Sequence, residues 1–167
     1  MYEHLKGLTK NGVPDFSSLK RFSESETANL NETHIEAPFE YVQYLKEVGH
    51  GEWLDEDGFA PYYFLPTLEN ASEEYFKDTL IYEIDADSPA AKGIVWLFAC
   101  DSIGQGFGFD SGDSWRVVRI DTGRSVERLD LSFLKFIEGL VVCYPIAPVS
   151  YADGKWFDGC GDSYPDE

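Results

Sequence analysis

The sequence predicts an α+β domain with an antiparallel or mixed sheet of about 4–6 strands and helices packed on one side of it. Two observations predict this class: strand-like segments separated by short turns follow one another through residues 93–121, and amphipathic helical patterns lie on both sides of them. The length of 167 residues suits one domain, which we expect to span 1–167.

Three successive segments carry the strand signal: 93–100, 106–110 and 115–121. The first is apolar throughout, as expected of a central strand that is buried on both faces. In the second, Phe107 and Phe109 alternate with glycines and share one face. Because only short turns separate the three segments, they predict an antiparallel meander.

A further extended segment and a helical region precede the meander. Phe59–Leu65 is rich in aromatic residues but contains Pro61, which has no N–H for a sheet ladder. We therefore expect an edge strand or an extended segment there. The pattern of Leu68–Leu80 predicts one or two short helices.

Two longer helices are expected on either side of these elements. The first follows Pro38 and ends at Gly49, and the second is capped by Asp130 or Ser132. Each has an apolar stripe at helical spacing. The stripes are Phe39, Val42, Leu45 and Val48 in the first helix, and Leu131, Leu134, Ile137, Leu140 and Val141 in the second.

Residues 1–37 carry a weaker pattern. Phe16, Leu19 and Phe22 have helical spacing, whereas Ser23–Asn31 is polar and a weak helix former. One or two short helices are expected in this part of the chain.

The net charge of −18 is concentrated in the middle of the chain. Residues 51–115 hold 14 acids and 2 bases, a net charge of −12, whereas residues 116–150 hold 4 acids and 5 bases. Such a segment repels nucleic acids and anionic lipids and attracts basic proteins. The simpler alternative is that the charge only keeps the protein soluble.

Cysteine spacing and apolar run lengths indicate a cytoplasmic protein. The three widely spaced cysteines, Cys100, Cys143 and Cys160, predict neither a disulfide framework nor a structural zinc site. Residues 1–10 lack the pattern of a signal peptide, and the apolar runs are shorter than the ~18 residues of a membrane span.

The sequence carries no strong catalytic or ligand-binding motif. Gly104–Gly108 lacks the Lys-Ser/Thr of a phosphate-binding loop, and a hairpin is favoured there. Asp55–Asp57 and Asp110–Asp113 lack the spacing of a calcium loop. We therefore expect no enzyme activity, cofactor, metal or small-molecule substrate. The alternative is a hydrolase that pairs Cys100 with a histidine.

A protein-binding surface is the favoured kind of site, because interfaces combine aromatic anchors with a polar rim. If the turns fall on one side of the sheet, the acids and aromatics of residues 52–115 form one patch. The alternative is that Trp53, Tyr63 and Trp115 belong to the core. The residues of the predicted patch are Glu52, Trp53, Asp55, Glu56, Asp57, Tyr62, Asp101, Asp110, Asp113 and Trp115.

The order of these elements resembles the SUKH superfamily, the domain of the yeast Smi/Knr cell-wall-assembly regulators and of many bacterial immunity proteins. The resemblance covers about residues 35–140 and leaves 141–167 as an acidic C-terminal extension. It is carried by Ala37–Lys46, Gly49-His50-Gly51, Trp96–Asp101, Gly106–Asp110 and Leu131–Ile137.

The resemblance implies a SUKH-like fold and a binding role. Bacterial members of the superfamily are commonly encoded beside polymorphic or contact-dependent toxins and neutralise them by binding. We therefore expect a cognate toxin as the partner, and a basic nuclease-type toxin would suit the acidic segment. The alternative is a regulatory or scaffolding module of the Smi/Knr type without a toxin.

Overall fold

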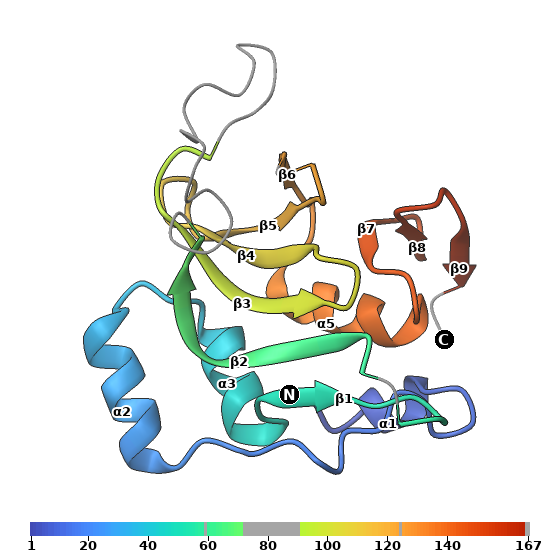
Figure 1. Ribbon diagram of the computed structural model, residues 1–167, viewed down its shortest axis with the longest axis horizontal. Coiled ribbons are helices and arrows are strands. Elements are labelled where there is room, and N and C mark those ends of the chain that lie inside the picture. Colours follow the sequence, from blue (N-terminus) through green and yellow to red (C-terminus); the bar gives the residue numbers. More distant parts are fainter. Residues whose placement is uncertain (59, 72–90, 124, 166–167) are drawn as a thin grey trace.

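The computed structural model describes residues 1–58, 60–71, 91–123 and 125–165, which form an α+β fold (Figure 1). The described helices are α1 (Leu5–Leu8), α2 (Glu24–Thr33), α3 (Phe39–Glu47) and α5 (Phe133–Val142). The described strands are β1 (Gly51–Trp53), β2 (Tyr62–Asn70), β3 (Val95–Asp101), β4 (Gly106–Asp110), β5 (Arg116–Ile120), β6 (Val126–Arg128), β7 (Pro148–Ala152), β8 (Lys155–Asp158) and β9 (Ser163–Pro165).

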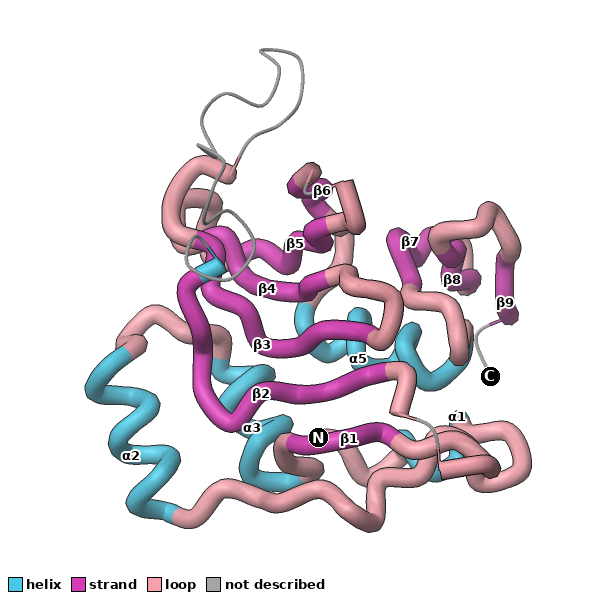
Figure 2. Tube along the Cα trace, in the orientation of Figure 1, coloured by secondary structure: helices cyan, strands magenta, loops and turns pink. Residues whose placement is uncertain are grey.

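Strands β1 to β6 form one sheet in the order of the sequence, and each pair of neighbours is antiparallel. Helices α1, α3 and α5 lie together on one face of this sheet (Figure 1). The predicted α+β class with an antiparallel sheet is therefore confirmed. Successive turns lie at opposite ends of the strands, as the tube view shows (Figure 2).

The predicted meander corresponds to β3, β4 and β5. Phe107 and Phe109 of β4 face the helices, and Gly108 faces the other way. A Cβ on Gly108 would lie 2.6 Å from the carbonyl oxygen of Trp96. The glycine therefore allows β3 and β4 to approach closely at this position.

The segment before the meander is extended, as predicted, but it is not at an edge of the sheet. β2 continues to Asn70 and pairs with both β1 and β3, so it is not an edge strand. Pro66 lies within the register shift of the β2–β3 pairing, where a missing N–H is tolerated. Of the helix predicted over Leu68–Leu80, residues 68–70 belong to β2 and residues 72–80 lie outside the described residues.

Both longer helices were predicted in the right place, but the stripe of the first was wrong at Phe39, which is 66% exposed, whereas Tyr41 and Tyr44 are fully buried. α3 begins directly after Pro38, and Gly49 follows it with a φ of 110°. A Cβ on Gly49 would also lie 2.5 Å from the carbonyl oxygen of Lys20. α5 is capped by the Ser132 hydroxyl, which accepts a hydrogen bond from the Lys135 N–H at 3.2 Å.

One or two short helices were expected within residues 1–37, and α1 and α2 both lie there. The segment with Phe16 and Phe22 is not helical, and Lys20 forms a β-bridge with His50. The helix α2 lies instead in the polar stretch that follows. Ser23 and Glu26 form a reciprocal capping box there, which satisfies N–H groups at the helix start.

The main core lies between the sheet and the helices, and aromatic rings dominate it. Phe98 of β3 packs against Phe109 with ring centroids 4.7 Å apart and against Phe133 of α5 at 5.1 Å. The C-terminal segment forms a second sheet, β7 to β9, which packs on α5 through the fully buried Trp156.

Candidate functional site: the acidic end of the sheet

The turns that follow β1, β3 and β5 meet at one end of the large sheet. Trp53, Tyr62 and Asp101 are direct neighbours across β1, β2 and β3. Beyond them, the Ser102 N–H donates to the carbonyl oxygen of Pro61 at 3.0 Å, which joins the first two turns. We call this region the acidic end and define it by its carboxylates: Glu52, Asp55, Glu56, Asp57, Asp101 and Asp121.

The carboxylates of the acidic end have two roles. Glu52, Glu56 and Asp57 are exposed. Asp55 and Asp101 are partly buried and shape their own turns. Asp55 accepts a hydrogen bond from the Asp57 N–H at 2.9 Å, and Asp101 accepts one from the Gln105 N–H at 2.8 Å. Burial nevertheless raises the pKa of Asp101 above its ordinary value.

Two residues of the acidic end were missed by the sequence analysis. Asp121 accepts a hydrogen bond from the Ser125 N–H at 2.9 Å and shapes the turn after β5. Ile103 is 66% exposed and lies in the turn that Asp101 closes. The order of the predicted strands could have indicated both residues, because every second turn of a meander lies at the same end of the sheet.

The described residues of these turns carry no lysine or arginine. Arg119 of β5 lies next to them and forms an ion pair with Glu127. Arg124, in the turn after β5, lies outside the described residues. The described residues of the acidic end therefore carry an excess of negative charge.

Two predicted anchors of the patch belong to the core instead. Trp53 has no exposed surface and Tyr62 has 1%, so neither side chain can contact a partner. The Tyr62 hydroxyl donates to the carbonyl oxygen of Pro145 at 2.9 Å. In both strands the neighbouring residue, Glu52 or Tyr63, faces outward. The alternation was visible in the sequence, but the choice of the inner face was not.

Asp110, Asp113 and Trp115 lie at the opposite end of the sheet, so the single predicted patch does not form. The strand β4 runs from Gly106, at the acidic end, to Asp110 at the other end. The physical reason is the antiparallel order itself, which sends consecutive turns to opposite ends.

The two acids at this opposite end are structural. Asp110 is fully buried, and its carboxylate accepts hydrogen bonds from the backbone N–H groups of Lys92, Gly93 and Gly112 at 2.8 to 3.0 Å. Asp113 pairs with three bases, Lys92, Arg116 and Arg128, at 3.1 to 3.6 Å. Their negative charge is therefore largely balanced within the protein.

Trp115 takes part in a half-buried ring cluster. Its indole N–H donates to Glu36 at 3.3 Å, and its ring centroid lies 6.3 Å from that of His34. His34 also meets Trp96 edge-on at 4.6 Å. Burial lowers the pKa of His34 below its ordinary value, so the ring is mainly neutral at pH 7.

The three histidines all have partners other than Cys100. His4 hydrogen-bonds to Glu138 at 3.0 Å, and the ring of His50 packs on Phe22. His34 packs on Trp96, which lies four residues from Cys100 in the same strand, or about 13 Å away. A pair of Cys100 with His34 would therefore require a rearrangement of the sheet.

Two further findings concern metal ions and the membrane. In the part of the chain that the structure describes, no three His, Cys, Asp or Glu residues converge in a way that could hold a metal ion. Of the described helices, none combines the length and the apolar character needed to cross a bilayer.

Comparison of the chain with protein-family models, with curated proteins and with solved structures finds no match. The SUKH resemblance therefore stays a prediction that rests on the short segments quoted above.

Proposed function

We propose that this chain is an immunity protein, which binds a cognate toxin domain stoichiometrically in the cytoplasm and thereby neutralises it. The observation that carries the proposal is the acidic end, where the exposed acids Glu52, Glu56 and Asp57 and the exposed side chain of Ile103 lie at the same end of the sheet. An apolar contact inside a charged rim suits a protein interface. The resemblance to immunity proteins of the SUKH superfamily supports the same role.

The charge of the acidic end favours a basic partner. Opposite potentials accelerate encounter and disfavour acidic competitors. A toxin that acts on nucleic acid must bind phosphate and is therefore basic around its active site. An acidic inhibitor could cover such a site without resembling its substrate in detail.

The direct test is co-expression with the toxin domain encoded beside the chain. The chain is expected to restore growth and to bind the purified toxin domain, and raising NaCl from about 0.05 M to about 0.5 M is expected to weaken binding. Failure to bind that domain would refute the immunity role. Binding to a protein that does not arrest growth would favour the regulatory alternative.

Charge reversal locates the interface. Glu56→Lys with Asp57→Lys is expected to weaken binding about tenfold, mainly through slower association. Glu32→Lys with Glu69→Lys is the matched control, because both side chains are exposed and lie outside the acidic end. The control is expected to change affinity less than about twofold. Equal effects of the two pairs would show that net charge, rather than the acidic end, determines binding.

A further inference from the structure

A turn between α5 and β7 lies at the same end of the large sheet as the charged turns of the acidic end. It consists of Tyr144, Pro145 and Ile146. The Tyr62 hydroxyl donates to the carbonyl oxygen of Pro145 at 2.9 Å, and the ring centroids of Tyr62 and Tyr144 lie 6.1 Å apart. Because Tyr62 is the direct neighbour of Asp101 across β2 and β3, these contacts attach the α5–β7 turn to the acidic end (Figure 1).

The α5–β7 turn offers an accessible surface without charge. Pro145 is exposed, Ile146 is 37% exposed, and Tyr144 is half-buried. Residues 143–150 contain no Asp, Glu, Lys or Arg. The centre of a protein interface is depleted of charged residues and enriched in tyrosine. The turn therefore has the composition expected at the centre of an interface.

Two carboxylates of the acidic end act on the tyrosines at this turn. Burial raises the pKa of Tyr144 to about 12, and the negative charge of Asp55 adds to the rise. Burial also raises the pKa of Tyr62, and the negative charge of Asp101 adds to that rise. Because the effect of a charge falls with distance, both carboxylates lie near the turn. The uncharged turn and these acids therefore belong to one surface.

Two bases also act on this region. Arg119 pairs with Glu127, and the ammonium group of Lys10 lies 5.6 Å from the ring centroid of Tyr164. The six carboxylates that define the acidic end outnumber these two bases. The net charge of the groups around the turn is therefore negative, which favours a basic partner.

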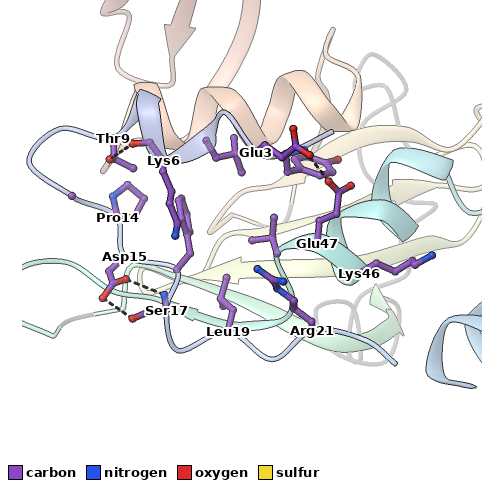
Figure 3. A pocket seen from close by; sticks show the side chains of 15 residues that line it. Glu3, Lys6, Thr9, Pro14, Asp15, Ser17, Leu19, Arg21, Lys46 and Glu47 are labelled. Carbon is purple, nitrogen blue, oxygen red and sulfur yellow. Dashed lines mark hydrogen bonds between the residues drawn. The ribbon is translucent and has the colours of Figure 1, made fainter. Parts of the chain in front are cut away.

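A pocket of about 880 Å³ is another place where a partner could dock (Figure 3). It lies between α1, the loop 12–21 and the end of α3, and a β-bridge between Asp15 and Leu54 joins it to the first turn of the acidic end. Because the charges of its lining balance, the pocket gives a basic partner no preference over an acidic one. The charged lining residues are Glu3, Asp15, Glu47, Lys6, Arg21 and Lys46.

We propose that the partner-binding surface extends from the acidic end onto the α5–β7 turn, and that this turn is its apolar centre. Because the inference rests on the proposed function, the partner is a basic toxin domain. It places an apolar side chain against Tyr144 and Ile146, and its surrounding Lys and Arg residues face the carboxylates of the acidic end. The apolar contact supplies affinity, and the charges supply orientation and rapid association.

Three exposed isoleucines allow a matched test, in which isothermal titration calorimetry measures binding of the toxin domain encoded beside the chain. Ile146→Arg places a charge in the proposed apolar centre and is expected to weaken binding at least about tenfold. Ile103→Arg changes the acidic end itself and is also expected to weaken binding. Ile35→Arg is the control, because Ile35 is 83% exposed and its neighbour Glu36 contacts Trp115 at the opposite end of the sheet. The control is expected to change affinity less than about twofold.

These proteins separate two kinds of failure. If the unchanged protein does not bind the toxin domain, the proposed function fails and the extended surface fails with it. If the unchanged protein binds and Ile146→Arg binds equally well, only the extension fails. Equal losses in Ile146→Arg and Ile35→Arg would also overturn the extension alone. Circular dichroism checks that each variant is folded.

Hydrogen exchange of the unchanged protein gives a second measurement, which does not depend on the folding of a variant. The Ile146 N–H donates to the carbonyl oxygen of Cys143 at 3.1 Å. The toxin domain is expected to slow exchange of this amide and to leave the amide of Ile35 unchanged. Protection confined to the turns after β1, β3 and β5 would overturn the extension.

Discussion

The indole N–H of Trp53 donates to the hydroxyl of Tyr44 across 3.0 Å in the centre of the core. Both side chains are fully buried, and the bond links β1 to α3. Burial raises the pKa of Tyr44 well above its ordinary value, so its hydroxyl stays neutral at physiological pH. This residue pair positions the start of the sheet against the helices, and the first turn of the acidic end follows directly after Trp53.

Tyr44→Phe is expected to lower the free energy of unfolding by about 1–3 kcal/mol, because it leaves the Trp53 N–H buried without an acceptor. Urea denaturation measures the change. The control is Tyr63→Phe, since Tyr63 is 39% exposed. That substitution is expected to stay within about 0.5 kcal/mol. Equal effects at the two positions would argue against a structural role for the bond.

Asp110→Ala is expected to destabilise the fold by about 3 kcal/mol, because three backbone N–H groups lose their acceptor. Urea denaturation gives the size of the change, and hydrogen exchange at Lys92 and Gly93 locates it. Asp57→Ala removes an exposed carboxylate and is expected to cost less than about 0.5 kcal/mol. If both substitutions had the same small effect, the structural role of Asp110 would be wrong.

Gly139→Ala is expected to destabilise the protein by about 1–3 kcal/mol, although alanine normally favours a helix. A Cβ at this position would lie 2.6 Å from Cδ1 of Trp156 and 2.7 Å from Cγ of Pro148. Because the new methyl group pushes β7 and β8 away from α5, their amide protons should exchange faster.

Gly7→Ala is the control for this change, because a Cβ on Gly7 has nothing within 4 Å. It is expected to leave stability unchanged or to raise it by up to about 1 kcal/mol, as for alanine in a helix. A stabilising Gly139→Ala would show that the C-terminal sheet does not depend on close packing against α5.

Acid is expected to weaken the C-terminal sheet through Asp158. Burial alone would raise the pKa of Asp158. Hydrogen bonds from the Cys160 N–H, the Tyr164 hydroxyl and the Asp162 N–H outweigh burial and hold the pKa below its ordinary value. The stabilisation is therefore complete above the unfolded pKa of about 4 and is lost as the pH falls through the lower folded value.

Urea denaturation at several pH values between about 7 and about 2 measures this dependence. Asp158→Asn should reduce the loss of unfolding free energy at low pH, because residue 158 no longer titrates. Asp153→Asn should leave it unchanged, since Asp153 is exposed in the turn between β7 and β8. If the unfolding free energy of Asp158→Asn falls at low pH as it does in the unchanged protein, this carboxylate is ruled out as the cause.

Local sequence patterns were sufficient for several elements. β4 has the predicted bounds, because glycines alternate with Phe107 and Phe109 between two aspartate turns. α3 and α5 were also predicted, since each combines an apolar stripe with a recognisable start or stop. Short helices were expected within residues 1–37, but the bounds of α2 were not assigned because its composition is polar, although the Ser23–Glu26 capping box was present in the sequence.

The candidate site was predicted only in part. Exposed acids such as Glu56 and Asp57 lie where the sequence placed them, in a turn after the first clear helix. Trp53 and Tyr62 were misassigned, because a period of two shows that neighbours face opposite sides without showing which side is covered.

The sequence by itself determined the α+β class, the meander and the concentration of acids in residues 51–115, because each depends on neighbouring residues. Only the tertiary structure decided which acids are available to a partner. Chain reversal at each turn carried Asp110 and Asp113 to the end opposite Asp101, and backbone amides and basic side chains there engaged them. Charge is a property of composition, but its exposure depends on which strands are neighbours and which face the helices cover.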